Sequence, residues 1–397
     1  MSALKVYVGM SGGVDSSLVA ALLVEQGYDV TGVYMKNWTQ DLPGMRCPWA
    51  DDLADAKRVA VQLGINFKVF DFETEYKHKV VEYMIEEYQN GRTPNPDIMC
   101  NQEVKFKLFL EASLEDGADF IATGHYARVW HGEVQQAVPG SDENGFVPGS
   151  IRAPAPYLAR AADVFLQSQG LPAGSSAAEL CQAADTNKDQ TYFLYRVSEK
   201  ALEKTLFPLG EFTKPQVREM AKARNLYTAT KKESQGICFV GQIGIREFLS
   251  QYIEAQPGAI INQQTGQQLG MHDGAIFYTI GQRHGLDVGG GLPYYVVGKN
   301  MYKNEVYIST NLNDKALWPT AVRLDSVHWI NNDPKLGELQ ARVRHRAPLV
   351  PVKLRHNEDG GVIIEFSNPE RAVTPGQSVV LYDRMRCLGG GIVSECF

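Results

Sequence analysis

The chain of 397 residues lacks features that would place it in several common classes of protein. Its six cysteines, at positions 47, 100, 181, 238, 387 and 396, form no Cys-x-x-Cys pair, which disfavours a zinc ribbon or a cysteine-ligated iron–sulfur cluster. No apolar run reaches about 18 residues, so no transmembrane helix is expected. The first apolar segment starts within about four residues of Met1, which leaves no room for a signal or transit peptide. These absences predict a cytoplasmic protein whose cysteines are reduced unless catalysis includes a redox step.

Positive charge is also scarce. The net charge of −7 is unusual for a protein that binds nucleic acid. Residues 314–397 are the least acidic part and contain the run Arg342-Val343-Arg344-His345-Arg346. Such a run can contact phosphates, and a solvated strand edge explains it equally well. Electrostatics alone therefore does not predict an RNA partner.

The length exceeds the usual size of one core, so two or three domains are expected. Residues 1–130 alternate between strand and helix patterns, which predicts a parallel sheet with its ligand at the carboxyl ends of the strands. Strands are predicted at 4–9, 29–35, 65–70 and 119–123, and helices at 15–26, 50–63, 74–89 and 103–115.

The composition and the predicted secondary structure change twice along the rest of the chain. Residues 131–184 are rich in Pro, Gly, Ala and Ser, with one expected helix near 157–169, and residues 187–240 return to helix patterns. Short β-like runs follow, which predicts a small β-rich unit and then a β-barrel. These strands are expected at 275–280, 294–297, 305–308, 321–327, 339–343, 350–354, 361–366, 378–382 and 391–393. The expected domains are 1–240, with an insertion at about 131–187, then 241–313 and 314–397.

The run Ser11-Gly12-Gly13-Val14-Asp15-Ser16 stands between the first expected strand and the first expected helix. A glycine pair there lets backbone N–H groups approach a phosphate, and the helix dipole adds positive potential. The Gly-Lys-[Ser/Thr] of the Walker loop is missing, so the loop carries no phosphate-binding lysine. An ordinary glycine turn is the alternative. The pattern resembles the PP-loop of ATP pyrophosphatases, which split ATP between the α and β phosphates and leave AMP on a substrate oxygen.

Two cysteines have surroundings that suggest reactivity. Cys100 lies in Asn95-Pro96-Asp97-Ile98-Met99-Cys100-Asn101, which is expected to be a loop just before a helix, where a thiolate is favoured. Cys238 follows Lys231-Lys232, whose charge also favours a thiolate. A buried cysteine and a buried strand are the respective alternatives. Together the two form a candidate pair in which one sulfur attacks and the other resolves a disulfide.

Taken together, these segments resemble the tRNA-specific 2-thiouridylases, which thiolate the wobble uridine of certain tRNAs. The match spans nearly the whole chain, in the order found in the family. Its segments are Gly9–Ser16, Gly32–Trp38, Gly91–Asn101, Ala122–Arg128, Lys188–Gln190, Ser234–Phe239 and Tyr278–Arg283.

This resemblance implies an α/β PP-loop domain, a central β-rich domain and a C-terminal β-barrel. Cys238 would carry a persulfide, Cys100 would be the nucleophile and partner thiol, and the two would form a transient disulfide. Asp15 would act in catalysis. ATP would be held by Gly9, Met10, Ser11, Gly12, Gly13, Val14, Asp15, Ser16, Met35 and Gly124. The target base would meet Asn95, Pro96 and Asp97. The tRNA would be contacted by His125, Lys188, Asp189, Gln190, Arg344, His345 and Gln377.

The resemblance further implies Mg²⁺ that is not held by a cluster of protein ligands, and it implies the tRNAs for Lys, Glu and Gln as substrates. A sulfur-relay protein or a cysteine desulfurase would donate sulfur, no membrane would be involved, and the protein would be a monomer. The chain departs from the family pattern at 131–187, where many bacterial members have a short hairpin; this insertion adds Cys181, which we take as non-catalytic. Two alternatives stay open, an amide-forming PP-loop ligase and a nucleotide-sensing RNA-binding protein without enzymatic activity.

Overall fold

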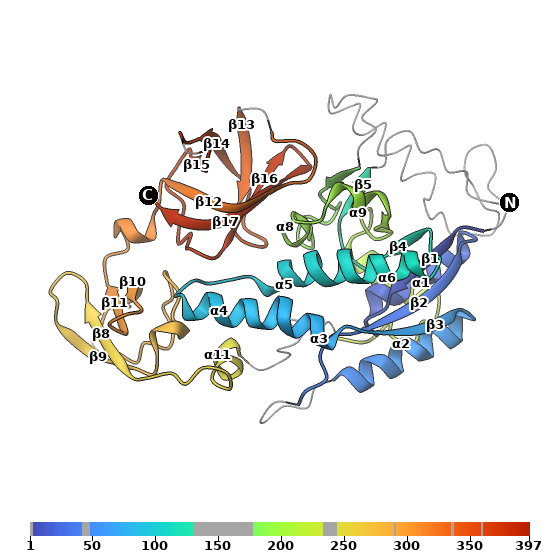
Figure 1. Ribbon diagram of the computed structural model, residues 1–397, viewed down its shortest axis with the longest axis horizontal. Helices are drawn as coiled ribbons and strands as arrows, with labels where there is room; N and C mark the ends of the chain where they lie inside the picture. Colours follow the sequence, from blue (N-terminus) through green and yellow to red (C-terminus); the bar gives the residue numbers. More distant parts are fainter. Residues whose placement is uncertain are drawn as a thin grey trace.

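The computed structural model describes residues 3–41, 48–130, 178–232, 244–289, 291–334, 337–358 and 360–397. Three sheets organise these residues (Figure 1). A parallel sheet with its helices lies on the right of the view, a small central sheet at the lower left, and a barrel at the upper left. This arrangement confirms the fold class predicted from the sequence.

The N-terminal sheet is parallel and has the strand order β3-β2-β1-β4-β7. Its strands are β1 (Lys5–Gly9), β2 (Asp29–Lys36), β3 (Asn66–Asp71), β4 (Phe120–Ala122) and β7 (Thr205–Leu206). The first four match the strands expected from the apolar runs. The two-residue β7 was not predicted, because so short a strand has no recognisable periodicity.

Helix α1 (Val14–Glu25) is buried from Ser16 to Leu23, since it lies between the sheet and other helices. Its neighbours are α2 (Trp49–Leu63) and α10 (Lys214–Ala223). A helix enclosed on all sides needs apolar residues around its whole circumference, as Leu18–Leu23 provide. The carboxyl end of β1 and the start of α1 are therefore fixed from several directions.

Two long helical segments run along the middle of Figure 1 toward the β domains. The first comprises α3 (Glu73–Tyr76), a π-helical stretch η1 (Lys77–Glu82) and α4 (Tyr83–Gln89). The second comprises α5 (Pro96–Met99), the π-helical η2 (Cys100–Leu108) and α6 (Phe109–Glu115). The prediction that this helix starts at 103 was wrong. Asn95 caps it and Pro96 fits its first turn, so it begins seven residues earlier.

Shorter helices complete the N-terminal part and lead into the central sheet. They are α8 (Thr191–Leu194), α9 (Glu199–Glu203) and α11 (Ile245–Leu249). The central sheet has the order β10-β11-β8-β9, with β8 (Gly258–Asn262), β9 (Gln268–His272), β10 (Tyr295–Asn300) and β11 (Glu305–Ser309).

The prediction of a strand at 275–280 was wrong. Residues Ala275–Phe277 form a 3₁₀ turn, η3, whose apolar side chains pack into the central core. Gly274 (φ 156°) and Gly281 (φ 85°) turn the chain on either side of this segment. The apolar run therefore marked burial, which a short turn can achieve as well as a strand.

The C-terminal domain is a closed antiparallel barrel with the order β12-β15-β14-β13-β16-β17, closed by pairing of β12 with β17. A 3₁₀ turn, η4 (Lys315–Leu317), leads into it. Its strands are β12 (Ala321–Trp329), β13 (Glu338–Arg342), β14 (Val350–His356), β15 (Val362–Phe366), β16 (Ser378–Asp383) and β17 (Arg386–Cys396).

Strand β17 is much longer than the predicted 391–393. Three glycines, Gly389–Gly391, interrupt its apolar pattern. The barrel packs tightly there, since a Cβ on Gly389 would lie 2.1 Å from the His328 carbonyl oxygen and one on Gly390 would lie 2.2 Å from that of Val379. The glycines thus permit close strand contact rather than ending the strand.

A hairpin from the N-terminal domain extends the barrel sheet. Strand β5 (Arg128–Trp130) pairs with β6 (Glu179–Cys181), and β6 pairs with β17. The insertion therefore leaves from the end of this hairpin. Residues 131–177, including the expected helix near 157–169, lie outside the described part of the chain. Within the described residues, no helix is long and apolar enough to span a membrane.

Candidate active site

The glycine loop lies at the carboxyl end of β1, as expected. Gly12 has φ 72°, and a Cβ there would lie 2.3 Å from the Asp52 carbonyl oxygen, so a side chain is excluded on both grounds. Gly13 is the N-cap of α1 and provides no side-chain cap. The Ser16 hydroxyl bonds within the loop, donating to the Gly13 carbonyl oxygen (3.3 Å) and accepting from the Ser11 N–H (3.2 Å). No side chain at the N-cap bonds to the first N–H groups of α1, and a helix start of this kind favours an anionic ligand.

Residues from neighbouring strands line the same edge. The Met35 Cε atom lies 3.0 Å from the position a Cβ would take on Gly9, and a Cβ on Gly124 would lie 3.0 Å from the Asp15 Cβ. Met35 belongs to β2, while Gly124 follows β4. The fold therefore brings together the loop, Met35 and Gly124, which are the residues expected to hold ATP. Their binding of ATP stays a prediction.

Asp15 has two partners that sequence reasoning did not assign. The Lys214 ammonium lies 2.7 Å from Oδ1 and 2.8 Å from Oδ2, and the Tyr126 hydroxyl donates to Oδ1 at 2.9 Å. Lys214 is the first residue of α10, which begins with a capping box formed by Thr213 and Gln216. The sequence indicated this helix start, but no local pattern could reveal a partner 199 residues away.

The cysteine motif lies in a helix rather than in the expected loop. The Asn95 side chain accepts from the Asp97 N–H (3.2 Å), Pro96 is buried, and Cys100 begins η2. Cys100 is 1% exposed and belongs to the large core that also contains Trp38 and Phe248. Asn95 and Asp97 are half-buried. The thiol is therefore enclosed in this conformation, while the three residues expected to meet the base form the capped start of its helix.

The segment that leads into this helix is held by both β domains. The Thr93 N–H donates to the Pro375 carbonyl oxygen of the barrel (3.0 Å), and the Thr93 hydroxyl lies 3.2 Å from that of Thr279 in the central domain. Gly376 packs so closely that a Cβ would lie 2.6 Å from the Thr93 nitrogen. All three domains thus meet at the approach to Cys100.

Cys238 lies outside the described residues, as does the whole stretch 233–243. On one side of this gap, the Lys231 ammonium contacts Asp52 (2.8 Å) and Asp55 (2.6 Å) at the start of α2, beside the glycine loop. On the other side, Phe248 of α11 packs against Trp38 in the core that contains Cys100. The proposed pairing of Cys100 with Cys238 stays a prediction.

Two of the expected tRNA contacts are buried. The Asp189 side chain is fully enclosed, accepts from Arg342 at 2.6 Å, and also receives bonds from the Thr191 hydroxyl (2.8 Å) and the Ala183 N–H (3.1 Å). His125 is 8% exposed and pairs with the Thr123 hydroxyl at 2.8 Å. Burial keeps the pKa of His125 well below its ordinary value, so it is neutral. The structure therefore places both side chains in the interior, and their contact with tRNA stays a prediction.

The other expected tRNA residues lie nearer the surface. Gln190 is half-buried, and its side-chain oxygen accepts from the Tyr126 N–H (2.9 Å). Lys188 is half-buried and Arg344 is exposed. His345 packs against the Phe193 ring at 4.5 Å, and burial, with Arg346 and Arg342 nearby, lowers its pKa to about 4.

Buried polar atoms occur beside this group. His345 Nδ1 and Gln377 Oε1 are buried and have no hydrogen-bond partner among the described residues. The run at 342–346 is therefore not a uniform basic surface, because Arg342 is committed to Asp189 and His345 is neutral at pH 7. Arg344 and Arg346 are the exposed cations of the run.

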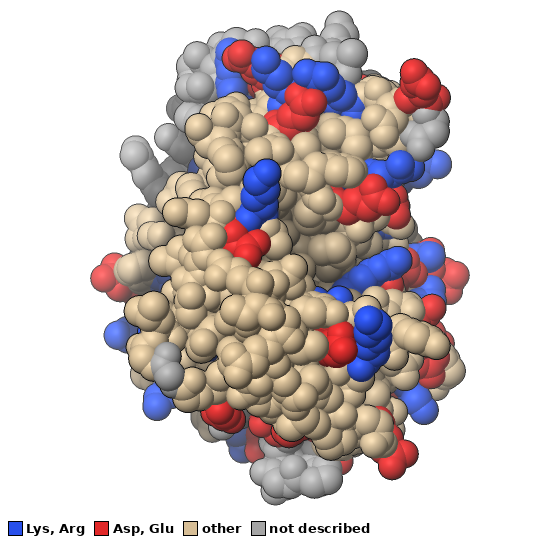
Figure 2. Space-filling view, turned by 90° about the vertical axis from the view of Figure 1, so that its left-hand side faces the viewer, with Lys and Arg blue, Asp and Glu red and all other residues tan. Residues whose placement is uncertain are grey.

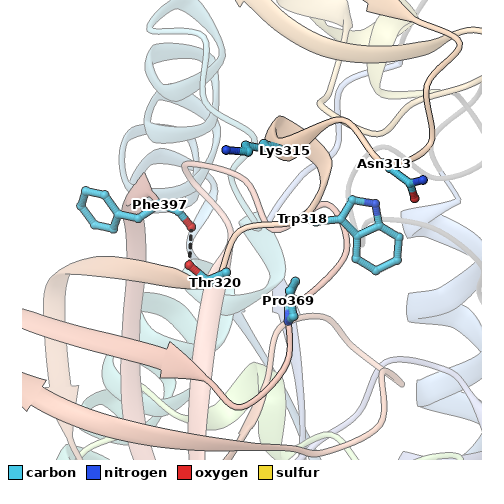
Figure 3. Close-up of a pocket in the computed structure, with 6 residues that line it drawn as sticks. All are labelled: Asn313, Lys315, Trp318, Thr320, Pro369 and Phe397. Carbon is cyan, nitrogen blue, oxygen red and sulfur yellow. Dashed lines mark hydrogen bonds between the residues drawn. The ribbon is translucent and has the colours of Figure 1, made fainter.

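One cavity in the described part of the chain lies away from these residues. An open cavity of about 710 Å³ lies where η4 meets the barrel, lined by Asn313, Lys315, Trp318, Thr320, Pro369 and Phe397 (Figure 3). None of the residues expected in the site lines it.

The face that Figure 2 presents shows scattered charges of both signs rather than a single basic area. Burial raises the pKa of Cys181 to about 12, which keeps that thiol protonated.

The described residues contain no group of three or more His, Cys, Asp and Glu that could hold a metal ion. Asp15 is a single carboxylate, with 30% of its side chain exposed at the glycine loop. One such carboxylate fits a magnesium ion that is carried mainly by phosphate oxygens and water, as is usual for this ion with nucleotides.

Comparison with protein families matches the chain in three parts. A tRNA methyl transferase HUP domain profile matches residues 4–145 and 158–242, a tRNA methyl transferase PRC-barrel domain profile matches 246–310, and an aminomethyltransferase beta-barrel domain profile matches 320–393. The first profile is interrupted within the insertion.

Two curated relatives match almost end to end. The tRNA-specific 2-thiouridylase MnmA of Bacillus subtilis (strain 168) is 42% identical over 397 residues, which cover 99% of this chain and 95% of that protein. MnmA 2 of Geobacillus kaustophilus (strain HTA426) is 42% identical over 396 residues with the same coverage. Among solved structures, NMN synthetase from Francisella tularensis covers 58% of this chain and 66% of its own, with 15% identity and a TM-score of 0.29, which is too low to carry an argument.

Proposed function

We propose a mechanism from the premise that this chain belongs to the tRNA-specific 2-thiouridylase family and is a tRNA sulfurtransferase. The family assignment replaces the two alternatives that the sequence left open, the amide-forming ligase and the RNA-binding protein without enzymatic activity. The proposal is that ATP adenylates O2 of the wobble uridine, and that a persulfide on Cys238 supplies the sulfur that replaces this oxygen.

The glycine loop would bind the phosphates of ATP. The supporting observation is the uncapped start of α1, directly after a glycine whose φ of 72° and contact with the Asp52 backbone exclude any side chain. Met35 and Gly124 would border the nucleotide. Mg²⁺, held chiefly by the phosphates with Asp15 nearby, would offset the charge of the departing pyrophosphate.

Adenylation is needed because the uracil C2 oxygen is a poor leaving group. When O2 attacks the α-phosphorus, the bond to the β-phosphate oxygen breaks and pyrophosphate leaves with the electron pair. The oxygen at C2 then departs as part of AMP in the next step. Reaching C2 requires the base to leave its stack, which is easier in an anticodon loop than in a duplex.

Sulfur transfer would use both cysteines. In one route the terminal persulfide sulfur on Cys238 attacks C2, AMP leaves, and the Cys100 thiolate then attacks Cys238 Sγ to release thiouridine. In the other route Cys100 attacks first, and the released sulfide attacks C2. Both routes form a Cys100–Cys238 disulfide, which a reductant must reopen.

The buried position of Cys100 has a consequence for this scheme. With 1% exposure, the thiol reaches a base or a persulfide only when the surrounding core opens. Asn95, Pro96 and Asp97, at the start of the same helix, would meet the target base. Thr93, held by Pro375 and Thr279, links that helix to both β domains, so tRNA bound by the β domains could reposition it.

The tRNA contacts would come from Lys188, Gln190, Arg344, His345 and Gln377. Asp189 and His125 would support these contacts from within, since both are buried. The proposed substrates are the tRNAs for Lys, Glu and Gln, a sulfur-relay protein or a cysteine desulfurase would load Cys238, and the enzyme would act as a monomer.

Mass spectrometry of nucleosides tests the proposal directly. Unmodified tRNA is incubated with the protein, ATP, Mg²⁺ and a sulfide source, then digested to nucleosides. We expect 2-thiouridine together with AMP and pyrophosphate in equal amounts. ADP and orthophosphate instead of AMP and pyrophosphate would contradict adenylation, and 2-thiouridine formed without ATP would contradict the need for activation.

A further inference from the structure

The glycine loop contains no cation of its own. From Gly9 to Tyr28 the sequence has no Lys or Arg, so the loop itself offers the triphosphate only backbone N–H groups and the positive end of α1. A helix N-terminus is equivalent to about half an elementary charge. ATP carries several negative charges, and pyrophosphate gains charge as it leaves. A site that cleaves ATP between the α and β phosphates needs more positive charge than this loop provides.

Lys214 of α10 lies at the edge of the glycine loop, although α10 is far from the loop in sequence. Lys214 Nζ lies 2.7 Å from Asp15 Oδ1, and Asp15 is the second residue of α1. The Lys214 side chain is 10% exposed, whereas that of Asp15 is 30% exposed, so the ammonium lies beneath the carboxylate at the edge of the loop. The Tyr126 ring lies 5.6 Å from the ammonium, and its hydroxyl bonds to the same carboxylate.

The ion pair is not needed to hold α10 against α1. Val217 and Ala221 of α10 are fully buried in the core that contains Leu18 and Leu22 of α1. The start of α10 is fixed separately, because the Lys214 N–H donates to Asp185 Oδ2 at 2.9 Å and a capping box follows. A mostly buried ion pair is weak evidence for a stabilising role. A functional role explains the buried charge of Lys214 better than a contribution to stability does.

We propose that Lys214 binds the β- and γ-phosphates of ATP and stabilises the pyrophosphate as it leaves. The inference rests on the adenylation proposed above and names a residue for it. As the uridine O2 bonds to the α-phosphorus, the electron pair of the broken bond moves to the departing pyrophosphate oxygen. Lys214 donates hydrogen bonds to that group and keeps its proton. In the absence of nucleotide, Asp15 holds the ammonium in position.

The long, flexible lysine stem suits this exchange of partners. An ammonium can turn from one acceptor to another without losing its charge, and lysine is a usual phosphate ligand in nucleotide loops of other design. Here the cation comes from the chain 199 residues after Asp15 rather than from the loop itself. Lys214 would thus be a catalytic residue, and Tyr126 a positioning residue for Asp15.

Binding of ATP, AMP and pyrophosphate to the full-length protein, measured by calorimetry, tests the assignment. The variants are Lys214→Met, Lys214→Gln and, as a matched control, Lys222→Met, which removes an exposed lysine of the same helix. For Lys214→Met and Lys214→Gln we expect the affinities for ATP and pyrophosphate to fall about tenfold or more, because a hydrogen bond to a charged group is lost. The affinity for AMP should stay within about twofold, and retained AMP binding also shows that the variant is folded.

Two results would overturn the assignment. Unchanged ATP and pyrophosphate binding would show that Lys214 does not reach the phosphates. An equal loss for ATP and AMP in both variants would show that Lys214 only supports the loop. Failure of the proposed function looks different, since the wild-type protein itself would then bind no ATP or would form no AMP in the presence of tRNA.

Discussion

Arg342 of the barrel donates to Asp189 of the N-terminal domain across 2.6 Å, and both side chains are buried. The Thr191 hydroxyl and the Ala183 N–H complete the environment of the carboxylate. Tyr382, whose hydroxyl lies 3.1 Å from that of Thr191, connects the group to β16. This network, together with the β6–β17 pairing, joins the barrel to the nucleotide-binding domain.

Asp189→Asn should destabilise the protein by about 3–5 kcal/mol, because Arg342 is left as a buried, uncompensated charge. Denaturant unfolding measures the change. Asp383→Asn is the matched control, since it alters a partly exposed ion pair with Arg386 at 3.4 Å and should cost less than about 1 kcal/mol. Equal stability of the two variants would argue against the network, and a double replacement of Asp189 and Arg342 by apolar residues should recover much of the loss.

Gly12→Ala should weaken ATP binding by about ten- to a hundredfold. The substitution combines the backbone strain of φ 72° with overlap against the Asp52 carbonyl oxygen, and such strain amounts to about 1–3 kcal/mol. Gly64→Ala separates the two effects. Gly64 has φ 66° but no atom within 4 Å of the added Cβ, so this control should lose stability without losing ATP affinity. Normal ATP binding by Gly12→Ala would remove the loop from the nucleotide site.

Cys100→Ser and Cys238→Ser should each abolish formation of 2-thiouridine while ATP binding persists, because each thiol takes part in sulfur transfer and neither is expected to hold nucleotide. Nucleoside mass spectrometry and ATP calorimetry provide the two measurements. Cys396→Ser is the control, since this cysteine lies in the barrel and burial raises its pKa to about 11. Robust thiolation by either of the first two variants would refute the two-thiol scheme.

His345 should make stability depend on pH below neutrality. Burial, together with Arg346 and Arg342, lowers its folded-state pKa from 6.5 to about 4. The unfolded chain therefore takes up the proton first, so stability is lost as the pH falls from about 6.5 to about 4. His345→Gln should flatten this part of the melting-temperature profile. Parallel profiles for wild type and His345→Gln would contradict the shift.

Local patterns predicted most of the parallel domain because each of its elements carries its own signal. Strand β1, the glycine loop and α1 follow one another without interruption, and Gly12, Gly13 and Ser16 define the turn between them. The barrel strands were also recognisable from their alternation. Prediction was least accurate where a short motif overrode the apolar pattern, as at the Asn95 cap, or where burial did not require a strand, as at 275–277.

Pairings between distant residues could not be predicted in this way. Lys214 meets Asp15, Arg342 meets Asp189, and Thr93 meets Pro375 and Thr279 only because the chain folds back on itself. No local periodicity encodes which charged residue will be enclosed. The sequence therefore contained no indication that Asp189 and His125, both expected to contact tRNA, are buried.

The amino-acid sequence by itself determined the order of the elements, the position of the glycine-rich turn and the two cysteine motifs. These depend on backbone preferences and on residues within a few positions of one another. Only the tertiary structure decided which charges became buried pairs, how strands β5 and β6 joined the barrel, and that Cys100 is enclosed. These depend on contacts among three domains, whose energies arise only when distant segments exclude water together.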